Sequence, residues 1–217
     1  LISGVLQPSQ GEIIINGNNL TTLKPTQRAR QISIVPQNPQ LPLNFTVLDL
    51  VLMGRNPHLK LLQWEQPEDL EIARLTMRIT NIDHLANRSL YTLSGGERQR
   101  ASLAMALAQE APILLLDEPT SNLDITYQTN VMHLIKDVSS KHNGAVLLTM
   151  HDLTLAAQYC SRLIMIAEGR SYVEGPPNKV LTPENISYVY GSNVSVLSHP
   201  DKNTPIVLPA FDREAQV

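Results

Sequence analysis

Two groups of residues within 93–124 have the types and the spacing needed for phosphate chemistry. The first, Ser94–Gly96, can present successive backbone N–H groups and a hydroxyl at the start of a helix, where phosphate binds. The second is the acid pair Asp117 and Glu118 directly after an apolar run. Carboxylates at the end of a strand hold Mg²⁺ and water. The stretch therefore predicts both halves of a site for nucleoside triphosphate chemistry.

Each group also has an ordinary structural explanation. A serine before Gly95 and Gly96 is typical of a helix N-cap with a turn, and an apolar strand followed by two acids also occurs at helix starts. The combination favours the chemical interpretation. Arg-Gln-Arg follows Glu97, and the apolar strand with its acid pair comes after that helix.

Three further polar residues are candidates because of where they stand in the chain. Gln37 ends a predicted strand between two prolines, and its neutral amide could ligate Mg²⁺ or its waters. His151 follows another predicted strand, where an imidazole could contact a phosphate, although a lone histidine is more often structural. Asp124 precedes a predicted helix at 125–141, so it is also a candidate N-cap.

The elements that must position these residues alternate between strand and helix. We expect strands at 32–35, 113–116, 145–149 and 163–166, and helices at 97–109, 125–141 and 153–160. The 113–116 strand is apolar without alternation, as a parallel sheet covered on both faces requires. Because ligands bind at the carboxyl ends of such strands, Asp117 is well placed to act. These patterns predict an α/β fold with a parallel sheet.

The remaining segments predict smaller features. Leu1–Leu6 is interpreted as the end of a helix stopped by Pro8, and a turn at Asn16-Gly17 follows a strand at 12–16. Between residues 37 and 92 strand signals are scarce, and helices are expected at 49–53, 67–80 and 83–86, forming a helical subdomain. Near the C-terminus we expect an edge hairpin at 171–174, a helical tail to about residue 190 and a possible strand at 206–208.

Composition narrows the function classes. The 217 residues are 42% hydrophobic and 17% charged with a net charge of −3, which is ordinary for a globular domain and suggests no nucleic-acid partner. Cys160 is the only cysteine, so no intrachain disulfide forms and a reducing compartment is expected. No apolar run approaches the about 20 residues of a membrane span, and the N-terminus does not resemble a signal peptide. We expect a soluble, cytoplasmic chain.

The sequence LSGGERQRASLAMALAQEAPILLLDEPTSNLD at 93–124 closely resembles the signature motif, Walker B motif and D-loop of ATP-binding-cassette ATPases. The resemblance implies a P-loop NTPase-like parallel sheet core with an inserted all-helical subdomain, its N-terminal strands missing. It assigns residues 1–36 and 97–175 to the ATPase core, the first part as a helix and a β-hairpin. Residues 37–96 form the helical subdomain with the signature motif, and 176–217 a C-terminal extension.

The resemblance also implies roles for the candidate residues. Asp117 would bind Mg²⁺ through water, Glu118 would act as general base and His151 would contact the γ-phosphate. Gln37 matches the Q-loop and would ligate Mg²⁺. Ser94, Gly95 and Gly96 would hold ATP bound to the other subunit of a head-to-tail homodimer, and Asp124 would reach across that interface.

The partners implied by the family are two membrane-spanning permease subunits and, indirectly, a substrate-binding protein, with the ATPase peripheral to the inner face of the membrane. Closure would act on the permeases through the region near Gln37 and 41–45, although those apolar residues could equally be ordinary packing. Gly54–His58 and Thr182–Gly191 look like the importers of iron–siderophore, haem and cobalamin type.

One expected motif does not occur in the sequence. No glycine precedes a lysine, so the phosphate-cradling G-x-x-x-x-G-K-[ST] is absent. We interpret the chain as truncated at its N-terminus and expect it to be inactive alone. One alternative is a natural non-catalytic regulatory chain. Another is a soluble cassette ATPase of repair or translation, which the short interval between Gln37 and Leu93 and the single cassette disfavour.

Overall fold

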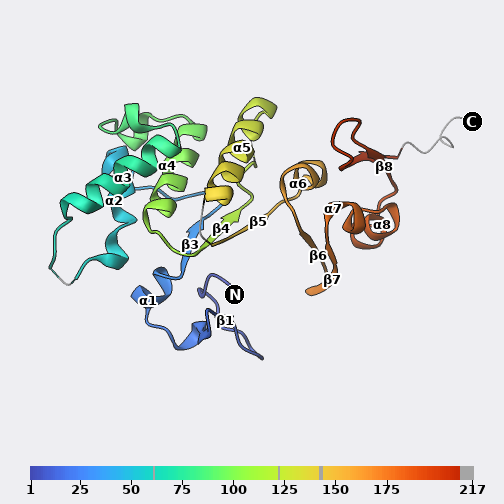
Figure 1. The fold of residues 1–217 in the computed structure, drawn as a ribbon, viewed down its shortest axis with the longest axis horizontal. Coiled ribbons are helices and arrows are strands. Elements are labelled where there is room, and N and C mark those ends of the chain that lie inside the picture. Colours follow the sequence, from blue (N-terminus) through green and yellow to red (C-terminus); the bar gives the residue numbers. More distant parts are fainter. Residues whose placement is uncertain (61, 122, 142–143, 211–217) are drawn as a thin grey trace, which may run out of the picture. The chain divides into compact units, whose positions relative to one another are not determined.

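The computed structural model of the protein describes residues 1–60, 62–121, 123–141 and 144–210, which form two compact units, 1–149 and 150–217 (Figure 1). The strands of the first unit are β1 (Ile14–Ile15), β2 (Asn18–Asn19), β3 (Ile32–Val35), β4 (Ile113–Asp117) and β5 (Ala145–Thr149). Its α-helices are α1 (Pro25–Ala29), α2 (Val47–Met53), α3 (Pro67–Ile79), α4 (Gly95–Ala108) and α5 (Ile125–Lys141). Its 3-10 turns are η1 (Leu20–Thr22), η2 (Asn56–His58), η3 (Asp83–Leu85) and η4 (Leu90–Thr92).

The three central strands of this unit form a parallel sheet in the order β3-β4-β5. In their register Val35 pairs with Leu116, and Asp117 pairs with Thr149. Buried apolar residues such as Leu114 and Leu116 suit a strand that is covered by helices. The predicted α/β class with a parallel sheet is confirmed. The carboxyl ends of all three strands therefore meet at one edge.

A helical cluster lies beside the sheet, where α2 and α3 both pack against α4 (Figure 1). Alanines at 101, 104 and 108 share one face of α4 at helical spacing, and their small side chains let the other helices approach closely. The buried core of the cluster consists of Val47, Leu50, Val51, Ala73, Met77, Ile82, Leu85, Leu90, Leu93, Ala101, Ala104 and Ala108. Because Leu93 belongs to this core, the turn that begins at Ser94 is fixed to it.

The expectation of a helix at Leu1–Leu6 is wrong. Residues 1–13 form turns and bends, and the first α-helix is α1. Gly4 and Gly11 have φ of 71° and 75°, which no α-helix accepts. The turn at Asn16-Gly17 is present, with φ of 48° and 77°, but the strand before it is only Ile14–Ile15.

The other expected elements of the first unit are found within a few residues of their predicted ends, except that 83–86 is a 3-10 turn.

In the second unit the strands are β6 (Leu163–Ala167), β7 (Arg170–Gly175), β8 (Val194–Ser198) and β9 (Pro205–Pro209), and the helices are α6 (Leu153–Tyr159), α7 (Pro177–Val180) and α8 (Pro183–Tyr190). The predicted hairpin is β6–β7, and β8, which the sequence analysis missed, pairs with β9. No helix among the described residues is long and apolar enough to cross a membrane.

Candidate active site

Gln37 and Glu118 meet at the carboxyl edge of the sheet. Gln37 follows β3 and Glu118 follows β4, and pairing of these two strands brings together residues that are 81 positions apart. The Gln37 Nε2 donates a hydrogen bond of 2.6 Å to the Glu118 Oε2. A bond to a carboxylate is stronger than one between neutral groups. The amide therefore fixes the direction of the Glu118 carboxylate.

Thr149, which the sequence analysis missed, joins the two acids on the next strand. Its Oγ1 donates to the Asp117 Oδ1 at 2.5 Å and accepts from the Glu118 backbone N–H at 3.0 Å. Glu118 has φ of 43°, a left-handed conformation that is costly for a residue with a side chain. One hydroxyl thus supports both the side chain of Asp117 and the strained backbone of Glu118. In the sequence, the only sign of this role is a hydroxyl residue at the end of an apolar strand. The pairing of Thr149 with Asp117 is visible only in the structure.

Ser94 is the N-cap of α4, and Gly95 and Gly96 are the first residues of that helix. The cap is reciprocal: the Ser94 Oγ accepts from the Glu97 N–H at 3.3 Å, and the Glu97 Oε2 accepts from the Ser94 N–H at 2.7 Å. These two hydrogen bonds hold the pKa of Glu97 below its usual range, although partial burial opposes them. The structural explanation of Ser94 is therefore correct; Ser94 and Gly95 are exposed to solvent, whereas Gly96 is buried.

Tyr127 at the start of α5 lies close to Gly96, and Asp124 caps α5. A side chain on Gly96 would approach the ring of Tyr127 to 3.2 Å, closer than most real contacts. Asp124 caps α5 through its Oδ1, which accepts from the Tyr127 N–H at 3.0 Å. The N-cap interpretation of Asp124 is thus correct, while a role across a subunit interface stays a prediction.

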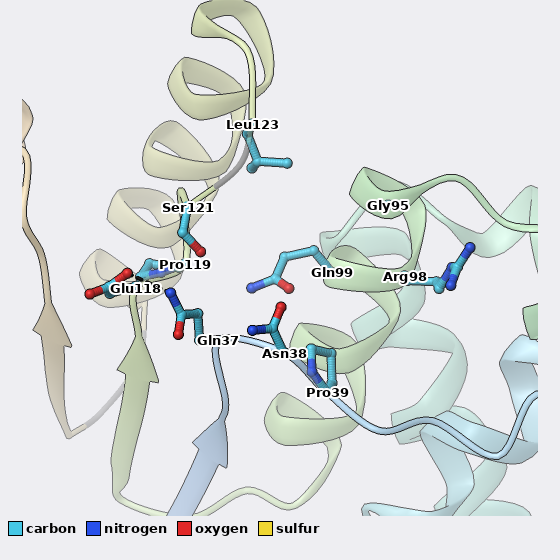
Figure 2. A pocket seen from close by; sticks show the side chains of 10 residues that line it. All are labelled: Gln37, Asn38, Pro39, Gly95, Arg98, Gln99, Glu118, Pro119, Ser121 and Leu123. Atoms are coloured by element: carbon cyan, nitrogen blue, oxygen red, sulfur yellow. Dashed lines mark hydrogen bonds between the residues drawn. The ribbon is translucent and has the colours of Figure 1, made fainter.

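A cavity of about 250 Å³ connects these groups. Figure 2 shows the side chains of Gln37, Asn38 and Gln99 around the cavity, with Gly95 at the start of α4 and Arg98 pointing away from it. Its lining consists of Gln37, Asn38, Pro39, Gly95, Arg98, Gln99, Glu118, Pro119, Ser121 and Leu123. Five of these ten residues end in an amide, hydroxyl or carboxylate, and Arg98 carries a guanidinium. The cavity therefore suits a polar ligand that needs hydrogen bonds.

The donor set at the strand ends fits Mg²⁺. Asp117, Glu118 and Gln37 offer carboxylate and amide oxygens, and Mg²⁺ in proteins uses one or two carboxylates while it keeps several waters. Among the described residues no three His, Cys, Asp or Glu side chains form a metal-binding group.

The structure brings together four of the eight predicted site residues. Gln37, Asp117 and Glu118 share the strand ends, and Gly95 lines the same cavity as two of them. Ser94, Gly96 and Asp124 lie at the starts of α4 and α5, and their expected contacts require a second subunit. His151 follows β5 but belongs to the second compact unit, so its contact with the site stays a prediction.

Comparison with known proteins agrees with this arrangement. A model of the ABC transporter family matches residues 1–121, and the chain therefore belongs to the ABC transporter family. It is 38% identical over 208 residues to the ferric enterobactin transport ATP-binding protein FepC of Escherichia coli, covering 96% of this chain and 77% of that protein. It is 40% identical over 218 residues to the hemin import ATP-binding protein HmuV of Myxococcus xanthus, covering 96% and 79%.

Two further matches differ in the share of the other protein that the chain covers. It is 37% identical over 212 residues to the cobalamin import ATP-binding protein BtuD of Halobacterium salinarum, covering 98% of this chain but 53% of that protein. The chain thus spans about half the length of this relative. A solved structure of an ABC transporter described as metal-chelate type, in an inward-facing conformation, superposes with a TM-score of 0.83 at 28% identity, covering 97% and 79%.

Proposed function

We propose that this chain is part of an ATP-binding and ATP-hydrolysing subunit of an importer for an iron complex, such as a siderophore or haem, or for cobalamin. The observation that carries the proposal is the Gln37–Glu118 hydrogen bond beside Asp117 at the ends of adjacent parallel strands. The transported compounds named for its relatives support the substrate class.

In this proposal the residues at the strand ends carry out the hydrolysis. Asp117 and Gln37 would hold Mg²⁺, Glu118 accepts a proton from the attacking water, and Gln37 also orients the Glu118 carboxylate. When bound, Mg²⁺ neutralises charge on the transferred phosphoryl group. His151 contacts the γ-phosphate, a role supported by its place after β5.

Ser94, Gly95 and Gly96 bind the phosphates of ATP held by a second copy, because the start of α4 offers N–H groups and a favourable dipole. Asp124 reaches across the same homodimer interface. The dimer acts on membrane-spanning permease subunits served by a substrate-binding protein, and it is peripheral to the cytoplasmic face of the membrane. The division into core (1–36 and 97–175), helical subdomain (37–96) and C-terminal extension (176–217) belongs to this proposal.

We further propose that these 217 residues do not hydrolyse ATP by themselves. The sequence has no Gly-Lys pair to cradle the phosphates. Adding ATP and Mg²⁺ to this chain alone should give no turnover, whereas the natural protein that contains it should be active. Turnover by the chain alone would refute this part, and inactivity of the natural protein would favour the non-catalytic alternative.

Glu118→Gln in the natural protein tests the main proposal. Loss of the general base should lower kcat by about a hundredfold or more, and ATP should then trap a dimer that size-exclusion chromatography detects. Glu168→Gln is the matched control, since Glu168 also has a left-handed backbone, with φ of 50°, but lies in the β6–β7 turn. Full turnover by the Glu118 variant would show that Glu118 is not the base.

A further inference from the structure

Arg55 lies at the centre of a buried group of contacts on the motif Gly54–His58, for which the proposed chemistry has no use. Arg55 is only 6% exposed. Its Nε donates to the Asp69 Oδ1 at 2.9 Å, and its Nη1 donates to the carbonyl of Ala108 and to the Glu110 Oε2, both at 2.7 Å. One guanidinium therefore joins α3 to the last residue of α4 and to the segment after it.

Asp69 is the ionised partner of the buried Arg55 guanidinium. Burial alone would raise the pKa of Asp69, but the Gln66 backbone N–H and the hydrogen bond and charge of Arg55 lower it more, so its pKa is below the usual range. The carboxylate is thus ionised at neutral pH. A buried pair of this kind is weak evidence for stability, because desolvation offsets much of the attraction. We therefore look for the effect of the Arg55–Asp69 pair in how it orients the helices that it joins.

Neighbouring residues fasten the same end of α4 to the base of the sheet. The His58 Nε2 lies 2.8 Å from the carbonyl of Gln109, so this nitrogen carries the proton. The Gln109 amide in turn donates to the carbonyls of Ala29 and, at 2.7 Å, Ile32. The Arg30 Nε donates to the carbonyl of Pro57 at 2.7 Å. The C-terminal end of α4 is therefore tied to α1, to β3 and to the helical cluster.

Gly54 brings α2 against α4 at the same place. A side chain here would overlap the carbonyl oxygen of Met105, so only glycine allows this approach. Helix α4 has 14 residues and is about 21 Å long at 1.5 Å per residue. Its far end carries the turn Ser94–Gly96. Because Leu93 belongs to the same core as α4, a change in the direction of α4 at its fastened end would be passed to that turn through the helix and the core.

We propose that Arg55 is a positioning residue for the Ser94–Gly96 turn, because its contacts with Asp69, Ala108 and Glu110 set the direction of α4. The proposal rests on the proposed function, in which that turn binds ATP held by a second copy. Arg55 touches no nucleotide itself and acts through the helix. The motif Gly54–His58 is then an anchor of α4, and it recognises no transported compound.

The backbone conformation of Glu110 offers a way to separate a positioning role of Arg55 from a purely stabilising one. Its φ is 51°, a conformation in which glycine is favoured after a helix. Glu110→Gly should relieve that strain while it removes one contact of Arg55, so stability and positioning should respond in opposite directions. Glu168 has φ of 50° in the β6–β7 turn, and Glu168→Gly makes the same change without the contact to Arg55.

The test uses the natural protein with Glu118→Gln as parent and follows ATP-driven dimer formation by light scattering. We compare Arg55→Met, Glu110→Gly and Glu168→Gly in that parent, and measure Tm and the ATP affinity of the separate subunit. Glu110→Gly should leave Tm unchanged or higher, yet raise the ATP concentration for half-maximal dimerisation roughly fivefold, a typical size for coupled sites. Arg55→Met should raise it further, and Glu168→Gly should match the parent. ATP affinity of the separate subunit should not change.

Each failure has a distinct meaning. If the parent does not dimerise with ATP, the proposed function fails. If the parent dimerises and Glu110→Gly and Arg55→Met match it, the positioning role of Arg55 is wrong. The same conclusion follows if dimerisation falls only where Tm falls, since a stabilising role alone would then explain it. Should Arg55→Met not fold, Glu110→Gly decides the matter by itself.

Discussion

Replacing Thr149 by valine removes one hydroxyl and keeps the shape of the side chain and its preference for a strand. The Asp117 Oδ1 then loses a donor and the Glu118 N–H loses an acceptor. Glu118 would no longer be held in its left-handed conformation by that contact. We therefore expect the substitution to affect the active site far more than the fold.

The expected size follows from the bond to the carboxylate. A hydrogen bond to a charged group contributes about 1.5–3 kcal/mol. Because Thr149 is exposed and water replaces part of the interaction, we take the lower end. A loss of about 1.4 kcal/mol in the transition state lowers kcat about tenfold.

Steady-state ATP hydrolysis by the natural protein, together with its Tm, measures the effect. Thr149→Ser retains the hydroxyl and should keep kcat close to wild type, which separates the hydrogen bonds from other effects of substitution. If Thr149→Val keeps kcat within a factor of about two, the hydroxyl does not support the acid pair during catalysis.

Three further predictions concern single contacts. Gln37→Leu should lower kcat with a small change in Tm, because it frees the Glu118 carboxylate from its 2.6 Å bond; unchanged turnover would contradict that role. The pKa of Glu97 is lowered in the folded protein, so its contribution to stability is present above the unfolded value near 4.5 and is lost as pH falls through the folded value. Urea unfolding at pH 7 and pH 4 should therefore show a smaller acid-induced loss of stability in Glu97→Gln than in wild type, and equal losses would refute the linkage. Burial raises the pKa of the Cys160 thiol. Cys160 should therefore react with a thiol reagent at neutral pH more slowly than the free amino acid cysteine does. Equal rates would show that burial does not lower the reactivity of Cys160.

The sequence predicted best the features that depend on local pattern. Continuous apolar runs that end in Asp117 or Thr149 identified the parallel strands, and the Ser94-Gly95-Gly96 turn identified the start of α4. Pairing of β3 with β4 then placed Gln37 beside Glu118. Gln37 itself gained weight as a candidate only through the family resemblance. Thr149 was missed because its role depends on register across β4 and β5, which no local spacing encodes.

The errors have physical causes as well. Leu1–Leu6 has apolar residues at positions that suit a helix, but Leu1, Val5 and Leu6 are all exposed. Without a surface to pack against, the segment has no tertiary stabilisation and forms turns. Arg55 was noticed only as part of a subfamily motif, because its partners lie 14 to 55 positions away.

The direct pairing of β3 with β4 makes residues 36–112 a closed excursion between two adjacent strands. The chain leaves the sheet after Val35 and returns at Ile113, and Gln37, near the start of the excursion, stays at the strand ends through its bond to Glu118. For a flexible loop, doubling its length costs only about 0.6 kcal/mol of closure entropy. The middle of the excursion can therefore lengthen or shorten at little cost in closure entropy while Gln37 stays beside Glu118. Segments between Gln37 and Ser94 can thus differ in length without a change in the pairing of β3 with β4.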